Sequence, residues 1–205
     1  MIFVGHWDQI CTMLAPGPSP ALSVEEFFAF SNEHPGEKRE LIDGAPVVMA
    51  GGTIRHALIG ANLAFALDGA TRRKGCGALR DMFFRIAAND GHVFDPHVMI
   101  RRGPTGDLLT RTIGDAGAVF GVQSPSTMTR DRSVKLDGYL QAATLSQIVL
   151  VYPGEYRVES WTRDAEAVGP EGPRVLTVPS AALDVTLIEA SISLASMYES
   201  VDFAA

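Results

Sequence analysis

Residues 120–139, "FGVQSPSTMTRDRSVKLDGY", combine features found at the edge of an active site. A short apolar run leads into a Ser-Pro-Ser-Thr turn, and the helix expected after this turn carries Asp131 and Lys135. Cleavage of a phosphodiester would require clustered carboxylates that hold one or two Mg²⁺ ions, together with a cation that stabilises the charge developing on the phosphate. The apolar run contains no acid, so the carboxylates for such chemistry must come from other segments.

The first half of the sequence predicts helices and strands that could position such groups. Ser23, with Glu26 three residues later, is a capping-box pattern that begins a short helix ending near residues 34–36. Residues 38–50 predict two strands joined by an Asp43-Gly44 turn, which is typical of a hairpin. Apolar residues at helical spacing predict a long helix over residues 54–74, with Gly75 at its C-cap.

The second half predicts further strands and helices. Paired strands are expected over residues 78–87 and 92–100, on either side of an Asn89-Asp90-Gly91 turn. A Gly-rich loop, a buried strand and a helix follow over residues 102–117, 118–123 and 129–143. A second hairpin turns at Gly154, and the tail closes with a helix. This order predicts an α/β (α+β) fold, with an N-terminal arm over residues 1–22 and one domain over residues 23–205.

Composition excludes several classes of protein. With 205 residues, 46% of them hydrophobic and 20% charged, the chain can bury one sizeable core. Its longest apolar runs are far shorter than the roughly 20 residues that a membrane helix needs, and the N-terminus has no basic leader, so we expect a cytoplasmic protein. Cys11 and Cys76 lack metal-motif spacing, which favours two reduced thiols. The net charge of −7 argues against broad, non-specific nucleic-acid binding, although a local basic patch could still act.

Several motifs, taken in order, resemble a known family. They are "ELIDGAPVVMA", "HALIGANL" beginning at His56, "SPST", "RDRSVKLDGYL" and "QIVLVYPGEYRVESW". From about residue 23 to residue 201 the chain resembles the Uma-two family of restriction-endonuclease-like proteins, a branch of the PD-(D/E)XK nuclease superfamily. The resemblance implies a restriction-endonuclease-like mixed central β-sheet flanked by helices, with β-hairpins. It also implies a metal-dependent site at the sheet edge that cleaves DNA.

The resemblance also assigns site residues. Glu40 matches the family's Glu on the first strand, and Lys135 matches the Lys on the helix that follows the site. The two acids between them are replaced: His97 stands where the family has the Asp of Pro-Asp-Val, and Gly121 stands where it has a Glu. Because Mg²⁺ binds through oxygen ligands, the loss of two carboxylates should weaken Mg²⁺ binding sharply.

Neighbouring positions could compensate in part. Side chains two residues apart share one face of a strand, so Asp95 would lie beside His97, and Gln123 beside Gly121. Asp95 and His97 are therefore the candidate metal ligands, and an imidazole ligand would suit Mn²⁺, Fe²⁺ or Zn²⁺. The alternative for His97 is a hydrogen-bonded strand residue, and Gln123 is either a site residue or a polar residue at the sheet edge.

The candidate site also depends on how the elements assemble. We expect the strands carrying Glu40, residues 95–98 and residues 119–123 to belong to one sheet, with Lys135 facing them. Lys135 could instead pair with Asp131, one turn away on the helix surface. His56 could contact a phosphate from the start of the long helix, or serve as a cap or core residue.

Two functions of different classes remain open. The first is a metal-dependent DNA endonuclease, weakened or inactive in this chain, that acts through Glu40, Asp95 or His97, and Lys135. The second is a catalytically silent binding or assembly module, expected to be a homodimer, that retains the nuclease fold. The family favours the first as a class, and the residues at positions 97 and 121 favour the second for this chain.

Overall fold

The computed structural model describes residues 21–49, 51–103, 106–124, 128–163 and 172–203, and for residues 128–132 it describes the backbone alone. All but the last two residues of the expected N-terminal arm lie outside these ranges, as do Pro125, Ser126 and Thr127 of the "SPST" turn. The division into an arm and a domain therefore stays a prediction. In the described part of the chain, no helix is long and apolar enough to cross a membrane.

The N-terminal elements form as their local patterns predict. Helix α1 (Val24–Glu33) begins at the capping box of Ser23 and Glu26. Strands β1 (Arg39–Ile42) and β2 (Ala45–Val48) pair antiparallel. Asp43 and Gly44 join them with φ angles of 51° and 75°, the left-handed region that a two-residue hairpin turn requires. These predictions are confirmed.

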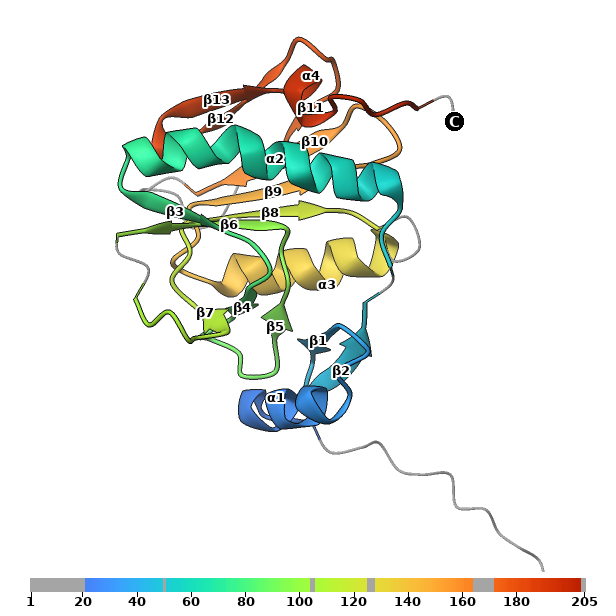
Figure 1. Cartoon of the computed structure of the whole chain (residues 1–205), viewed down its shortest axis with the longest axis vertical. Helices are drawn as coiled ribbons and strands as arrows, with labels where there is room; N and C mark the ends of the chain where they lie inside the picture. Colours follow the sequence, from blue (N-terminus) through green and yellow to red (C-terminus); the bar gives the residue numbers. More distant parts are fainter. Residues whose placement is uncertain (1–20, 50, 104–105, 125–127, 164–171, 204–205) are drawn as a thin grey trace, which may run out of the picture.

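A small five-stranded sheet occupies the lower half of the molecule in Figure 1. Its strand order is β2-β1-β5-β4-β7, with β4 at Phe83–Arg85, β5 at Val93–Phe94 and β7 at Thr112–Ile113. Strands β4 and β5 pair antiparallel on either side of the predicted Asn89-Asp90-Gly91 turn. Strand β7 lies within the predicted Gly-rich loop and pairs parallel with β4. Helix α1 packs against this sheet through Phe27, which is fully buried beside Leu41 and Val93.

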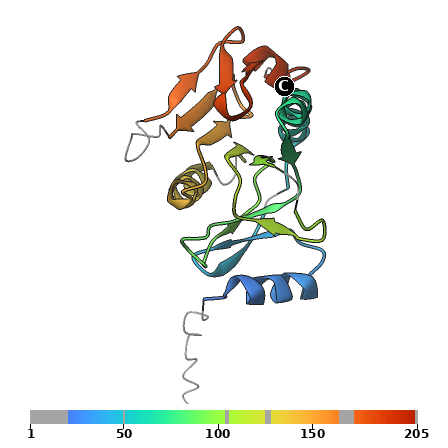
Figure 2. The same ribbon diagram turned by 90° about the vertical axis from the view of Figure 1, so that its left-hand side faces the viewer.

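A six-stranded sheet forms the centre of the molecule, in the order β11-β10-β9-β8-β6-β3. Its strands are β3 (Cys76–Leu79), β6 (Val98–Arg102), β8 (Ala118–Val122), β9 (Gln147–Val151), β10 (Val158–Thr162) and β11 (Arg174–Leu176). Helix α2 (Ile54–Arg73) covers one face and helix α3 (Met128–Gln141) the other (Figure 2). Alternate residues of β8 enter the two cores: Phe120 packs on the α2 side and Val119 on the α3 side.

The prediction of a single sheet for the candidate site is wrong. Glu40 lies on β1 in the small sheet, whereas β6 and β8 belong to the large sheet. The segment expected to be one strand over residues 92–100 is broken at Asp95-Pro96-His97, where the chain leaves β5 in one sheet and enters β6 in the other. Pro96 has no N–H to donate to a strand ladder, which explains why the strand stops there.

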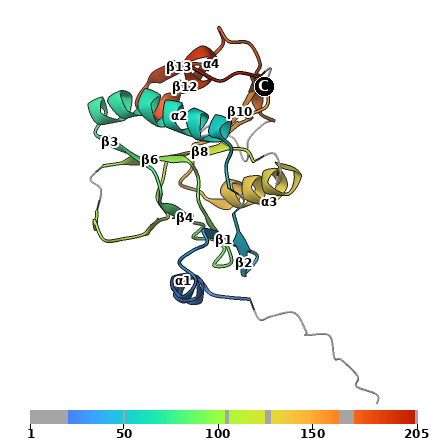
Figure 3. The same ribbon diagram turned by 45° about the vertical axis from the view of Figure 1, so that its right-hand side comes forward.

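The C-terminal segment is mostly a hairpin, whereas the sequence pattern predicted a closing helix. Strands β12 (Ala182–Val185) and β13 (Ala190–Ser193) pair antiparallel around a 3₁₀ turn, η1 (Thr186–Ile188). The only helix among its described residues is α4 (Leu194–Met197), a single turn that packs against α2. Figure 3 shows this hairpin lying over α2. The β-branched residues of the segment favour strands over a longer helix.

Candidate functional site

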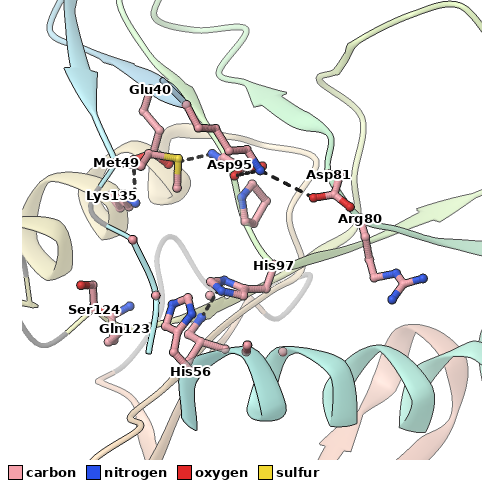
Figure 4. Close-up of a pocket in the computed structure, with 18 of the residues that line it drawn as sticks. Glu40, Met49, His56, Arg80, Asp81, Asp95, His97, Gln123, Ser124 and Lys135 are labelled. Atoms are coloured by element: carbon pink, nitrogen blue, oxygen red, sulfur yellow. Dashed lines mark hydrogen bonds and ion pairs between the residues drawn. The ribbon is translucent and has the colours of Figure 1, made fainter. Parts of the chain in front are cut away.

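The break between β5 and β6 borders a cavity of about 670 Å³ that reaches both sheets. Its walls come from β1 and β2, the start of α2, the junction before β6, the end of β8, and α3. All the predicted site residues line it (Figure 4): Glu40, Asp95, His97, Gln123 and Lys135. The structure therefore brings these residues together, although from two sheets instead of one.

Glu40 is a buried carboxylate, and each of its two oxygens has a partner. It is 3% exposed, its Oε2 lies 2.7 Å from Nζ of Lys135, and its Oε1 accepts a 2.7 Å hydrogen bond from the backbone N–H of Asp95. Burial raises the pKa of Glu40 and the ammonium of Lys135 opposes that rise. Lys135 thus faces into the cavity from α3, while the side chain of Asp131, its alternative partner, lies outside the described residues.

Asp95 is held by a second lysine. Its Oδ2 lies 2.6 Å from Nζ of Lys38, which is half-exposed and also lies 3.6 Å from Oδ1 of Asp81. Burial raises the pKa of Asp95, and the hydrogen bond and charge of Lys38 oppose this rise. Sequence inspection missed Lys38, although its place two residues before Glu40 could have indicated that both side chains project from the same face of the hairpin.

His97 has its accepting nitrogen occupied. Its Nδ1 accepts a 3.1 Å hydrogen bond from the backbone N–H of Val122, so the ring proton of the neutral imidazole lies on Nε2. Burial, helped by the neighbouring His56 and Lys135, lowers the pKa of His97 from 6.5 to about 3. The ring packs so closely on α2 that a Cβ on Gly60 would come within 3.1 Å of its Cδ2. His97 is therefore a fixed, neutral group.

His56 supports His97 at the start of α2. The two rings meet edge to face with centroids 4.5 Å apart, and burial lowers the pKa of His56. Thr53 caps the helix, accepting a 3.3 Å hydrogen bond from the backbone N–H of His56. Gly52 leaves room for the imidazole, because a Cβ there would lie 2.5 Å from its Nδ1. The proposed phosphate contact of His56 stays a prediction.

Gln123 and Gly121 lie side by side at the end of β8. The backbone N–H of Gln123 donates to Val151 at 2.8 Å, which continues the sheet by one residue. Gln123 is only 5% exposed, and its Oε1 is buried without a hydrogen-bond partner. A Cβ at Gly121 would meet Leu150 at 3.5 Å and Gln123 at 3.9 Å, both ordinary contact distances. A Cβ at position 121 therefore meets no steric obstacle.

These groups do not fit a hard divalent cation. Each of the two carboxylates has an ammonium within 2.7 Å, and the accepting nitrogen of His97 is used by Val122. Among the described residues, no three or more His, Cys, Asp or Glu side chains are placed to hold a metal ion. Mg²⁺ requires several oxygen ligands and dehydrates reluctantly, so it would have to displace both lysines from their carboxylates.

The lowered pKa of His97 predicts a loss of stability in acid. Below pH 6.5 the unfolded chain binds a proton at this residue that the folded chain does not bind until about pH 3, so stability falls as the pH drops through this range. The variant His97→Asn, whose amide oxygen can accept the Val122 hydrogen bond without titrating, should lack this loss. Urea unfolding at about pH 7 and pH 4.5 measures it, and a difference between the two proteins that does not change with pH would contradict a neutral, buried imidazole.

The two sheets and their flanking helices form an α+β fold, and the acid–lysine cluster lies at a cavity that reaches both sheets. Residues 24–191 match the Uma2 family, described as "Putative restriction endonuclease", and the chain belongs to this family. The fold also resembles the crystal structure of a "putative nuclease belonging to DUF820" from Anabaena variabilis, with a TM-score of 0.66, 12% sequence identity, and coverage of 80% of this chain and 90% of that one. A search of curated proteins found no match.

Proposed function

We propose that this chain is a restriction-endonuclease-like DNA-binding protein in which Mg²⁺-dependent cleavage is weak or lost. The observation that carries the proposal is the pairing of each site carboxylate with an internal ammonium, Glu40 with Lys135 and Asp95 with Lys38. Lysines in these positions supply the positive charge that a divalent ion would otherwise bring to the carboxylates. A metal ion therefore gains little by entering, and without it no water is activated for attack on a phosphate.

DNA is the proposed ligand because the family and the cavity both favour it. The family description names restriction endonucleases, and Arg80 brings an exposed cationic side chain to the cavity wall, where Lys38 and Lys135 are paired with carboxylates. Arg80 is exposed beside Asp81, where it could contact a phosphate outside the cavity. The net charge of −7 disfavours broad contact with a polyanion, so we place the proposed contact at the cavity.

The wild-type protein should show little or no Mg²⁺-dependent nicking of plasmid DNA, and little or no heat of Mg²⁺ binding by calorimetry. If His97 instead turns and offers Nδ1 to a metal, binding and cleavage should appear with Mn²⁺, which accepts nitrogen ligands, before they appear with Mg²⁺. The matched control is Lys135→Ala, shown to be folded by thermal unfolding and tested alongside the wild type. Mg²⁺-dependent nicking that disappears in Lys135→Ala would show that the site is a working nuclease and that the proposal is wrong.

We also propose that the protein is a homodimer formed through the exposed face of α2. Ile54 and Phe65 are 82% and 87% exposed and lie about three helical turns apart, which places them on one side of the helix. The small residues Ala57 and Ala61 between them are also exposed and would let an antiparallel α2 of a second copy approach closely, each Phe65 packing over the other copy's Ala57. α2 lies on the outside of the molecule in Figure 1.

Phe65→Asp should convert the dimer to a monomer, measured by light scattering on a sizing column. The control is Leu109→Asp, because Leu109 is equally exposed at 89% but lies in the loop before β7, away from α2. A wild-type protein that is monomeric at all concentrations tested, or a dimer that Phe65→Asp leaves intact, would contradict this interface.

A further inference from the structure

One residue that lines the cavity, Gln123, has a buried side-chain oxygen that accepts no hydrogen bond. The residue as a whole is 5% exposed. Gln147 offers a comparison: its Oε1 is also unpaired, but its Nε2 donates to Ser160 and Asp184. Buried polar groups are almost always paired in folded proteins, so the unpaired carboxamide oxygen of a residue that lines a cavity indicates a missing partner.

A hydrogen-bond donor accompanies the carboxamide. Because Nδ1 of His97 accepts from Val122, the proton on Nε2 is left to donate. His97 is held in this orientation by His56 and by its contact with Gly60. In Figure 4, the two imidazoles lie across the cavity from Glu40. The structure therefore places an unpaired amide oxygen and an imidazole N–H among the residues that line one cavity.

The charges of the cavity favour a neutral ligand. Three acidic side chains on its walls, Glu40, Asp81 and Asp95, are balanced by Lys38, Arg80 and Lys135. A cavity without net charge attracts neither a free cation nor a free anion strongly. Its other walls are apolar, and a volume of about 670 Å³ is in the range that accommodates a small organic molecule. The glycine at position 121 adds to the space beside Gln123, since no side chain fills it.

We propose that the cavity binds an unpaired adenine base, with Gln123 and His97 as the residues that recognise it. A glutamine carboxamide pairs with the N6 amino group and N7 of adenine through two hydrogen bonds, its oxygen accepting and its nitrogen donating. A further ring nitrogen of adenine accepts from Nε2 of His97. The inference rests on the proposed function in one respect: the base would reach the site as part of a bound, locally unpaired nucleic acid.

The test uses uncharged nucleosides, which lack phosphates and so report on the base pocket alone. Calorimetric titration of the full chain with adenosine, guanosine, cytidine and thymidine should show saturable binding of adenosine, and binding of the others weaker by roughly tenfold or more. Gln123→Leu, which keeps the size of the side chain and removes both polar groups, should weaken adenosine binding by at least about tenfold. Gln147→Leu, which removes a buried glutamine outside the cavity, should leave it unchanged.

Two outcomes would overturn the inference: no saturable adenosine binding up to the solubility limit, or equal adenosine binding by wild type and Gln123→Leu. Thermal unfolding confirms that the variants are folded. The melting temperature of Gln123→Leu should be no lower than that of the wild type, because the lost carboxamide oxygen had no hydrogen-bond partner. Fluorescence anisotropy with a DNA duplex runs in parallel. Adenosine binding without duplex binding would contradict the proposed function and support the base pocket. Duplex binding without adenosine binding would support the proposed function and contradict the base pocket.

Discussion

The double variant His97→Asp/Gly121→Glu is expected to gain a Mg²⁺ site that the wild-type protein lacks. It adds two carboxylates beside Glu40 and Asp95, so that the oxygen ligands outnumber the two lysines that now neutralise the site. The structure accommodates both changes: a Cβ at Gly121 meets only ordinary contacts, and a carboxylate at position 97 can accept the hydrogen bond of Val122. Either change alone should do much less, because the ligands of one metal act as a unit.

The measurements are Mg²⁺ binding by calorimetry and nicking of plasmid DNA by the folded double variant. We expect at least about a tenfold gain in Mg²⁺ affinity over the wild type, with cleavage that follows metal occupancy. The matched control is His97→Asn/Gly121→Gln, which has nearly the same size and shape without the charges. If the acidic pair gains neither binding nor cleavage, or if the amide pair gains as much, the remaining geometry no longer supports a nuclease site.

Lys135→Met is expected to destabilise the protein by about 3–5 kcal/mol at neutral pH, because it leaves a buried carboxylate without its cation. Glu40 is 3% exposed and has Lys135 2.7 Å away, so the carboxylate would lose the one ammonium that pairs with it directly while staying largely buried. Replacing both residues, Glu40→Gln with Lys135→Met, should restore much of the stability, since the amide carries no charge to desolvate. Urea unfolding of the wild type, the two single variants and the double variant gives the coupling between the residues.

The dependence on pH provides an independent check on this pair. Burial already raises the pKa of Glu40 above 4.5, and the loss of Lys135 should raise it further. A carboxyl whose folded pKa exceeds its unfolded pKa binds a proton more tightly in the folded state, so the single variant should regain stability as the pH falls towards 4.5. The surface pair of Lys74 and Glu189 is the control, and Lys74→Met should change little. A loss in Lys135→Met no larger than this control would mean that Glu40 is not held as the structure indicates.

The local elements could be predicted from the sequence because short-range physics determines them. The capping box at Ser23, the Asp43-Gly44 hairpin and the helix before Gly75 each depend on residues within a few positions of one another. The same holds for the buried strand β8 and the hairpin about Gly154. The motif order was also sufficient to identify the family, and with it the residues that gather at the cavity.

The closing hairpin shows where local patterns are insufficient. The apolar residues of positions 182–193 also fit a helical pattern, and the pairing between β12 and β13 adds to the strand preference of their β-branched residues and decides in favour of strands. The short strand β7 could not be predicted within the Gly-rich loop either, because its two residues form a strand only by pairing with β4. These contacts join segments that are far apart along the chain, and a pattern of neighbouring residues carries no information about them.

The sequence by itself determined which ionisable residues are present, and the tertiary structure decided what each one pairs with. The chain breaks at Pro96, and this break places Glu40 on a different sheet from His97 while still bringing both to one cavity. Lys38 reaches Asp95, and the backbone of Val122 occupies the imidazole nitrogen that a metal would need. These partners are decisive because burial and charge depend on distances in space, and distances between sheets follow from packing of the whole fold instead of from spacing along the chain.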